Sequence, residues 1–208
     1  MRLLATLPFA LLMACAPQAP VDADTPSASD TSARSEAPVE SADNADIGTA
    51  SATTPLPEGA QAPDFTAQAW LAGEPFRFTL TEALAKGPVV VYFFPAAFTP
   101  GCNLEARLFS ESIDAFKQRN ATVIGVTAGN ADQLAAFSSD NETCSGKFAV
   151  AADPGAQIAA QYGAVLESRP EWTSRTSFAI AADGRILRVH SDMSAEEHVR
   201  QMLAGLDG

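Results

Sequence analysis

The chain has 208 residues and a formal net charge of −12, with 13 basic against 25 acidic side chains. That balance, with no basic patch visible in the sequence, argues against nucleic acid as a partner. Hydrophobic residues make up 47% of the chain, enough for the core of one or two domains. Its three cysteines are too few for a disulfide-dense scaffold.

The N-terminal segment MRLLATLPFALLMAC predicts an export signal. Arg2 precedes a mostly apolar stretch that ends at Met13 and is too short to span a bilayer, as in a signal peptide. The closing LMAC resembles the lipobox of bacterial lipoproteins, although Met13 stands where a smaller residue is usual. The resemblance implies a signal peptide over 1–14 and a lipid anchor on Cys15. An ordinary cleaved signal with an incidental cysteine is the alternative.

The next segment, residues 15–56, is expected to be an acidic tether. Ala, Ser, Thr, Pro and Asp dominate it, aromatic residues are absent, and seven acidic residues face one basic residue. Such a composition cannot bury enough apolar area to become ordered, so we expect a disordered tether that reaches roughly 35 Å. The expected location is the cell envelope, on a membrane and facing the periplasm, or outside the cell if Cys15 carries no lipid.

Residues 57–208 are expected to form one domain of ordinary size. Apolar runs predict its strands, and apolar residues at helical spacing predict its helices. In chain order these are a strand at 89–94, a helix at 102–118, a strand at 121–128, a helix at 130–139 capped by Asn130, a strand at 147–153 and a capped helix at 153–163.

The last part of the domain predicts a hairpin over 177–191, with Asp183-Gly184 as its turn, and then a closing helix. Ser194 is the expected cap of that helix, with Glu197 three residues on. The alternation of strands and helices predicts an α/β fold with a central mixed sheet. His190 and His198 are interpreted as surface or strand positions, and nothing gathers them into a metal site.

Cys102 follows the first predicted strand and starts a predicted helix. A thiol in that first turn lies at the positive end of the helix dipole, beside unpaired backbone N–H groups. Both favour the thiolate, which is the reactive form. Thr99 can aim its hydroxyl at the same place, and Pro95 can shield the sulfur from water. The alternative is a buried structural cysteine.

The loop PAAFTPGCNLEA (95–106) resembles the active-site loop of the peroxiredoxins, Pro-x-x-x-Thr-x-x-Cys, and its TPGC is similar to the bacterioferritin-comigratory, or Q-type, branch. The similarity extends from QAPDF at 61–65 to SRTSFAIAADGRI near the end. The resemblance implies a thioredoxin-like fold in which helices flank the mixed sheet. It also implies a thiol peroxidase that reduces hydrogen peroxide and organic hydroperoxides without a metal or an organic cofactor.

On this resemblance Cys102 is the peroxidatic cysteine, which peroxide oxidises to a sulfenic acid. Thr99 and the Cys102 N–H would hold the peroxide, Pro95 would shield the sulfur, and Arg175 would stabilise the thiolate. Glu105 matches a glutamate often seen in the family, or it is a first-turn residue that complements the helix dipole.

Two routes could return the sulfenic acid to a thiol: a resolving cysteine in this chain or an external thiol. Many Q-type relatives carry a resolving cysteine five residues after the first, where this chain has Arg107. Other members of the branch carry it on or after the next helix, where Cys144 lies. Its neighbours Asn141, Ser145 and Gly146 suggest a segment that could rearrange without disturbing the core. Otherwise Cys144 is a packed thiol, and a thioredoxin-like or small-thiol reductant acts directly on Cys102.

Two other functions compete with the peroxidase. A thiol–disulfide or cytochrome-maturation protein with this fold normally carries Cys-x-x-Cys, but position 105 is glutamate. A binding lipoprotein without catalysis would not need Pro95, Thr99, Cys102 and Arg175 together.

Overall fold

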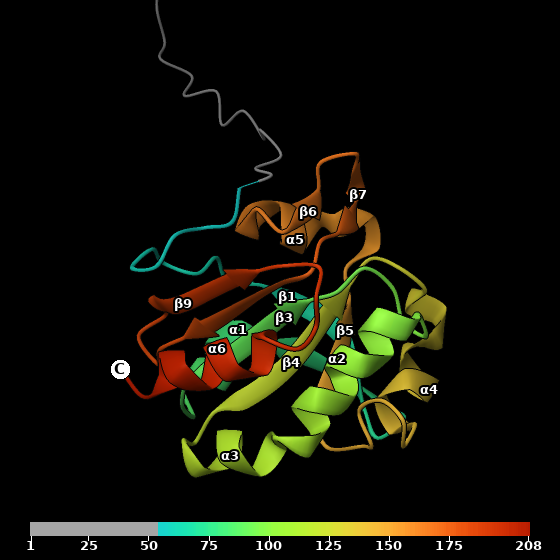
Figure 1. Cartoon of the computed structure of the whole chain (residues 1–208), viewed down its shortest axis with the longest axis horizontal. Helices are drawn as coiled ribbons and strands as arrows, with labels where there is room; N and C mark the ends of the chain where they lie inside the picture. The colour runs from blue at the N-terminus through green and yellow to red at the C-terminus, as the bar shows by residue number, and fades with distance from the viewer. Residues whose placement is uncertain (1–53) are drawn as a thin grey trace, which may run out of the picture. The chain divides into compact units, whose positions relative to one another are not determined.

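The computed structural model describes residues 54–208 (Figure 1). The predicted signal peptide, Cys15 and nearly all of the predicted tether lie outside the described residues. Within 54–208, no helix is both long enough and apolar enough to cross a bilayer.

A seven-stranded mixed sheet forms the centre of the domain, in the order β2-β1-β5-β4-β3-β8-β9. Its strands are β1 (Thr66–Leu71), β2 (Glu74–Thr79), β3 (Val89–Phe93), β4 (Thr122–Thr127), β5 (Ala149–Ala152), β8 (Thr176–Ile180) and β9 (Ile186–Ser191). β3, β4 and β5 run parallel, whereas β1 pairs with β5, and β8 with β3, in the antiparallel sense.

Helices lie over both faces of this sheet (Figure 1). They are α1 (Leu80–Leu84), α2 (Pro100–Glu111), α3 (Ile113–Gln118), α4 (Leu134–Ser139), α5 (Gln157–Tyr162) and α6 (His198–Leu206). The helices α2, α3, α4 and α6 pack into one core cluster, and α1 and α5 pack into the other. The predicted α/β fold, with a central mixed sheet flanked by helices, is confirmed.

The central strand β3 separates the two cores. All five of its residues are buried, as expected for a strand paired on both sides and covered on both faces. Alternate side chains enter different clusters: Val89, Val91 and Phe93 one, Val90 and Tyr92 the other. The carboxyl end of β3, from which the loop to Cys102 departs, is therefore fixed by packing on both sides.

The three predicted inner strands are confirmed, with ends that differ by at most two residues. The predicted hairpin is confirmed as β8 and β9, and Gly184 in its turn has a φ of 85° that favours glycine. The cap of the third predicted helix is also confirmed. Both carboxylate oxygens of Asp153 accept backbone N–H groups, from Ile158 and Ala159 at 2.9 Å.

The predicted helices differ from the structure in one start and in two caps. The helix expected at 102–118 begins at Pro100, whose missing N–H is not needed in a first turn, and it divides at Ser112 into α2 and α3. Asn130 caps nothing, because its amide instead donates to the Ala97 carbonyl at 2.8 Å. Ser194 lies before α6 with its hydroxyl on the Glu196 carboxylate, and the helix begins only at His198.

Two hairpins were not predicted. β1 and β2 form one edge of the sheet, and β6 (Val165–Leu166) pairs with β7 (Arg169–Thr173) outside it. The first four residues of β2 are exposed, as are the first three of β7. These strands hold no continuous apolar run, so the signal that revealed the inner strands is missing.

Candidate active site

Cys102 is the third residue of α2, at the carboxyl end of β3. Thr99 occupies the cap position and Pro100 starts the helix, so the backbone N–H groups of Gly101 and Cys102 have no carbonyl partner within the helix. The Cys102 residue is only 1% exposed. The thiol therefore lies at the positive end of a twelve-residue helix, shielded from bulk water.

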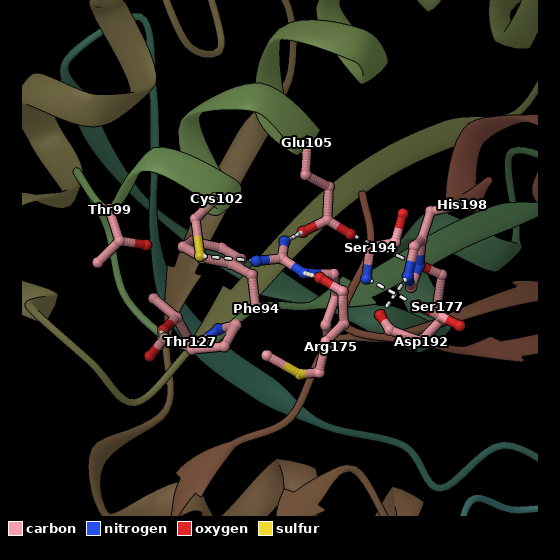
Figure 2. A network of polar contacts seen from close by, with 12 residues as sticks. Phe94, Thr99, Cys102, Glu105, Thr127, Arg175, Ser177, Asp192, Ser194 and His198 are labelled. Atoms are coloured by element: carbon pink, nitrogen blue, oxygen red, sulfur yellow. Dashed lines mark hydrogen bonds and ion pairs between the residues drawn. The ribbon is translucent and has the colours of Figure 1, made fainter. Parts of the chain in front are cut away.

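Arg175 reaches Cys102 from the short connection between β7 and β8. Its Nη2 donates to the Cys102 Sγ at 3.4 Å, its Nη1 donates to the Glu105 carboxylate, and its Nε donates to the Met193 carbonyl at 3.0 Å (Figure 2). Arg175 is only 4% exposed. The two residues are 73 positions apart in the sequence, and the structure brings them into contact.

Gly101 makes this approach possible. A Cβ atom at position 101 would lie 3.0 Å from the Arg175 Nη2, tighter than side chains normally pack. A glycine directly before Cys102 thus leaves the space in which the guanidinium meets the sulfur.

Hydrogen bonds to the end of β4 hold the loop before Cys102. The Pro95 carbonyl accepts from the Thr127 hydroxyl at 3.1 Å, and the Ala97 carbonyl accepts from Asn130. A Cβ atom at Gly129 would lie 2.3 Å from the Pro95 oxygen, so the two segments touch through backbone. These contacts from β4 were not predicted, because no sequence pattern links positions so far apart.

Thr99 and Pro95 lie on the same loop as expected. The Thr99 hydroxyl donates to the Ala96 carbonyl at 3.0 Å, which leaves its oxygen lone pairs free to accept a hydrogen bond. Figure 2 places Thr99 beside the first turn of α2 that carries Cys102. Pro95 is half-buried. Of the four predicted residues, the structure brings Cys102 and Arg175 into contact, and it places Pro95 and Thr99 on the loop that leads to Cys102.

Glu105 is fully buried against Arg175. Burial raises the pKa of Glu105 to about 8, and the Arg175 guanidinium opposes that rise. Of the two interpretations from sequence, the structure favours the family-like glutamate. A surface residue that only complements the helix dipole would not be fully buried against an arginine.

His198 is not a surface residue, and its interpretation from sequence is wrong. It is fully buried at the start of α6, where Nδ1 lies 2.7 Å from the Ser177 hydroxyl and Nε2 lies 2.9 Å from the Asp192 carbonyl (Figure 2). Nδ1 also lies 3.5 Å from the Glu105 Oε1. Sequence reasoning missed this residue because helical spacing places it on an amphipathic helix without showing what the helix covers.

Cys144 lies in a run of turns that follows α4, and it is 0% exposed. It packs in the same core cluster as Phe137 and Phe148, and burial raises the pKa of its thiol. The expectation that this segment could rearrange without disturbing the core is therefore wrong. Both Cys102 and Cys144 are free thiols in this structure.

The geometry suits attack by a thiolate on a small electrophile. A helix N-terminus and an arginine stabilise the negative sulfur, and free N–H groups beside it can hold a developing oxyanion. Among residues 54–208, no group of His, Cys, Asp and Glu side chains could hold a metal ion.

The family model described as the AhpC/TSA family matches residues 59–189. The chain belongs to this family. It is a peroxiredoxin, a thiol peroxidase that takes a peroxide as substrate and a thiol as reductant. The thiol–disulfide and binding-lipoprotein alternatives are not favoured.

Its relatives include peroxiredoxins of the bacterial Bcp and plant Q types. Peroxiredoxin Bcp of Escherichia coli K12 is 30% identical over 115 residues, which are 53% of this chain and 72% of the relative. The chloroplastic peroxiredoxin Q of Gentiana triflora is 29% identical over 126 residues, which are 60% and 56% of the two chains. The crystal structure of peroxidoxin BcpB from Mycobacterium tuberculosis, at 29% identity, covers 72% of this chain and 96% of its own with a TM-score of 0.62.

The first prediction concerns Arg175. Arg175→Met should lower the second-order rate constant for peroxide by about tenfold or more, because it removes a charged donor from a site that excludes water. The fraction of Cys102 present as thiolate at neutral pH, followed by its ultraviolet absorbance, should fall as well. Arg185→Met is the matched control, since Arg185 is exposed and, within 54–208, forms an ion pair only with Asp183, at 3.8 Å. An unchanged rate and an unchanged thiolate fraction would place Arg175 outside the chemistry.

Proposed function

We propose that this peroxiredoxin reduces hydrogen peroxide and organic hydroperoxides with Cys102 as its peroxidatic residue. The contact between the Arg175 Nη2 and the Cys102 Sγ, at the N-terminus of α2, is the observation that carries the proposal. The thiolate attacks one peroxide oxygen, an S–O bond forms, and the O–O bond breaks. The departing oxygen takes a proton and leaves as water or an alcohol, and Cys102 becomes a sulfenic acid.

In this proposal each neighbouring residue acts on the peroxide or the sulfur. The Thr99 hydroxyl oxygen accepts a hydrogen bond from the peroxide. The Cys102 N–H donates a hydrogen bond to a peroxide oxygen. Arg175 stabilises the thiolate and the charge that develops on the departing oxygen. Pro95 keeps water from the sulfur. No step requires a metal or an organic cofactor.

The second prediction tests the nucleophile. Cys102→Ser should abolish peroxide turnover and leave the fold intact, because a hydroxyl replaces a thiol of similar size but is a far weaker nucleophile at neutral pH. Peroxide consumption per mole of protein measures the loss, and circular dichroism measures the fold. Retention of more than a few per cent of wild-type turnover in a folded variant would remove Cys102 from this role.

We propose that Cys144 resolves the sulfenic acid. Attack by its thiolate would form a Cys102–Cys144 disulfide and release water, and an external thiol would then reduce the disulfide. In the folded state burial suppresses that thiolate, and hydrogen bonds hold the segment, including Gly146 N–H to the Ser138 carbonyl at 2.9 Å. Resolution therefore requires local opening of the residues around Cys144, which ionises the thiol and frees it to move.

The third prediction follows from this opening. One equivalent of peroxide should remove two thiols from the wild type, with a mass loss of about two hydrogens. Cys144→Ser should instead accumulate sulfenic and sulfinic acid on Cys102. Peptide mapping under non-reducing conditions measures both. A stable sulfenic acid beside a free Cys144 thiol in the wild type would make this a one-cysteine enzyme that depends on a thioredoxin-like or small-thiol reductant.

We also propose that the enzyme is a lipoprotein of the cell envelope, anchored through Cys15 and facing the periplasm. The support is the LMAC sequence directly after an apolar stretch, with the acidic segment to residue 56 as the tether between anchor and domain. Such a position would confine the peroxidase to peroxides that reach or arise at the membrane.

The fourth prediction tests the anchor. Cys15→Ala should move the protein from the membrane to the soluble fraction or block its processing, because the thioether to the lipid cannot form. Cys144→Ala is the matched control and should stay in the membrane fraction. Fractionation and the mass of the mature protein are the measurements. Maturation that resists the signal-peptidase inhibitor globomycin, or a mature wild-type mass without lipid, would reject the anchor.

A further inference from the structure

The polar contacts around Cys102 continue past Arg175 to the start of α6. Figure 2 shows the series Cys102, Arg175, Glu105, His198 and Ser177, drawn from α2, the β7–β8 connection, α6 and β8. Each of these residues is buried. His198, near the end of this series, has no part in the chemistry described above. It lies against the Glu105 carboxyl group, which accepts a hydrogen bond from Arg175 as the Cys102 sulfur does.

The hydrogen bonds of His198 fix its tautomer. The Asp192 carbonyl can only accept, so the Nε2 that lies 2.9 Å from it carries a hydrogen. A neutral imidazole then has a lone pair on Nδ1, to which the Ser177 hydroxyl donates. Burial lowers the pKa of His198 to about 4, which keeps the ring neutral near pH 7. The same Nδ1 lies 3.5 Å from the Glu105 Oε1, so Ser177 and a protonated Glu105 are alternative donors to one lone pair.

Glu105 presents an unsatisfied oxygen to the same space. Its Oε2 accepts from Arg175, but among residues 54–208 no donor reaches its Oε1, which lies 3.5 Å from the His198 Nδ1. A buried carboxylate oxygen without a donor is costly. A proton on Oε1 removes this cost, and a small rotation of either side chain lets it donate to Nδ1. Because Nδ1 has one lone pair, the Ser177 hydroxyl turns away from it in that state.

We propose that His198 is a positioning residue of the peroxidatic site: it shares one proton with Glu105 and so sets how much of the Arg175 charge faces Cys102. The proposal rests on the role of Cys102 given above. With the proton present, the Glu105 carboxyl is neutral and the guanidinium charge is left to the thiolate. Without it, the Glu105 carboxylate competes for Arg175 and repels the thiolate. The shared proton and the Cys102 thiolate therefore stabilise one another.

The groups that face this proton come from every neighbouring element. They are Cys102 on α2, Tyr92 on β3, Arg175 before β8, His190 on β9 and Asp192 before α6. Burial raises the carboxyl pKa and lowers the imidazole pKa, so the proton resides on Glu105 and the pair is uncharged. In a dry interior an uncharged pair is favoured over a carboxylate–imidazolium pair.

The test follows the reactivity of Cys102 toward a small neutral alkylating reagent as a function of pH, in a Cys144→Ser background so that only one thiol reacts. This readout does not require peroxidase activity, so failure of the proposed function and failure of this inference give different results. Because the two ionisations are coupled, the reference profile should rise in two steps rather than one.

His198→Gln replaces the imidazole by an amide that can still donate to Asp192 but holds a proton far more weakly. It should lower the alkylation rate at neutral pH by about threefold to tenfold and merge the two steps into one. Glu105→Gln keeps the carboxyl position neutral, so it should raise the rate and also leave a single step. In the Glu105→Gln variant, adding His198→Gln should not change the alkylation rate or its pH profile any further.

His190→Gln is the matched control, since its ring lies 4.6 Å from that of His198 and, within 54–208, no hydrogen bond or ion pair joins it to Glu105. It should keep the two-step profile. A uniform loss of rate at all pH values in His198→Gln, an unchanged profile, or the same change in His190→Gln would overturn the proposal. If His198→Gln does not fold, Glu105→Gln alone decides: a two-step profile in that variant would also overturn it.

Discussion

The Arg175 guanidinium, buried between the Cys102 thiol and the Glu105 carboxylate, is the interaction on which the rest of the site depends. A charge in such surroundings is tolerated only when its donors are satisfied, and removing one partner leaves the others uncompensated. Arg175 meets that condition with the sulfur, the carboxylate and the Met193 carbonyl. The chemistry of the sulfur thus cannot be separated from packing, because the cation that stabilises it also requires this burial.

The fold positions Arg175 by fixing both sides of its contact with Cys102. On one side the loop from β3 to α2 is bonded to the end of β4 through Thr127 and Asn130, and the Phe94 carbonyl accepts from the Thr173 hydroxyl. On the other side Arg175 leaves β7 and enters β8, which pairs with β3 itself. The donors around the sulfur are therefore in place before peroxide arrives, which is the condition for electrostatic catalysis without reorganisation.

Much of this could be predicted from local sequence signals. The apolar run of β3 and the Pro-Gly turn before Cys102 are strong local patterns, and they located the strand, the loop and the candidate nucleophile. The resemblance of the later segment SRTSFAIAADGRI to the same family supplied Arg175, which no spacing could have linked to Cys102. The exposed hairpin edges and the burial of His198 were not predictable in this way, because both depend on what another element covers.

The burial of Cys144 was also not predictable from its local sequence. Its polar neighbours Asn141 and Ser145 suggested a mobile surface segment, whereas the thiol itself turns inward to Phe137 and Phe148. Flanking polarity reports where the backbone lies, and not where one apolar side chain points.

The burial of both thiols imposes an asymmetry on the catalytic cycle. A sulfur that is 1% exposed favours peroxides with small substituents, which need little more room than water. A resolving thiol or a protein reductant cannot, because thiol–disulfide exchange requires sulfur to meet sulfur and the Cα atoms of a disulfide to approach within about 7 Å. Oxidation thus fits the packed state of the site, whereas recycling requires it to open. The sulfenic acid favours that opening, because it removes the negative charge that Arg175 and the helix N-terminus were arranged to stabilise. Under the proposed role of Cys102, the interaction that stabilises its thiolate therefore weakens once the sulfur is oxidised, which favours opening of the site at the step that needs access.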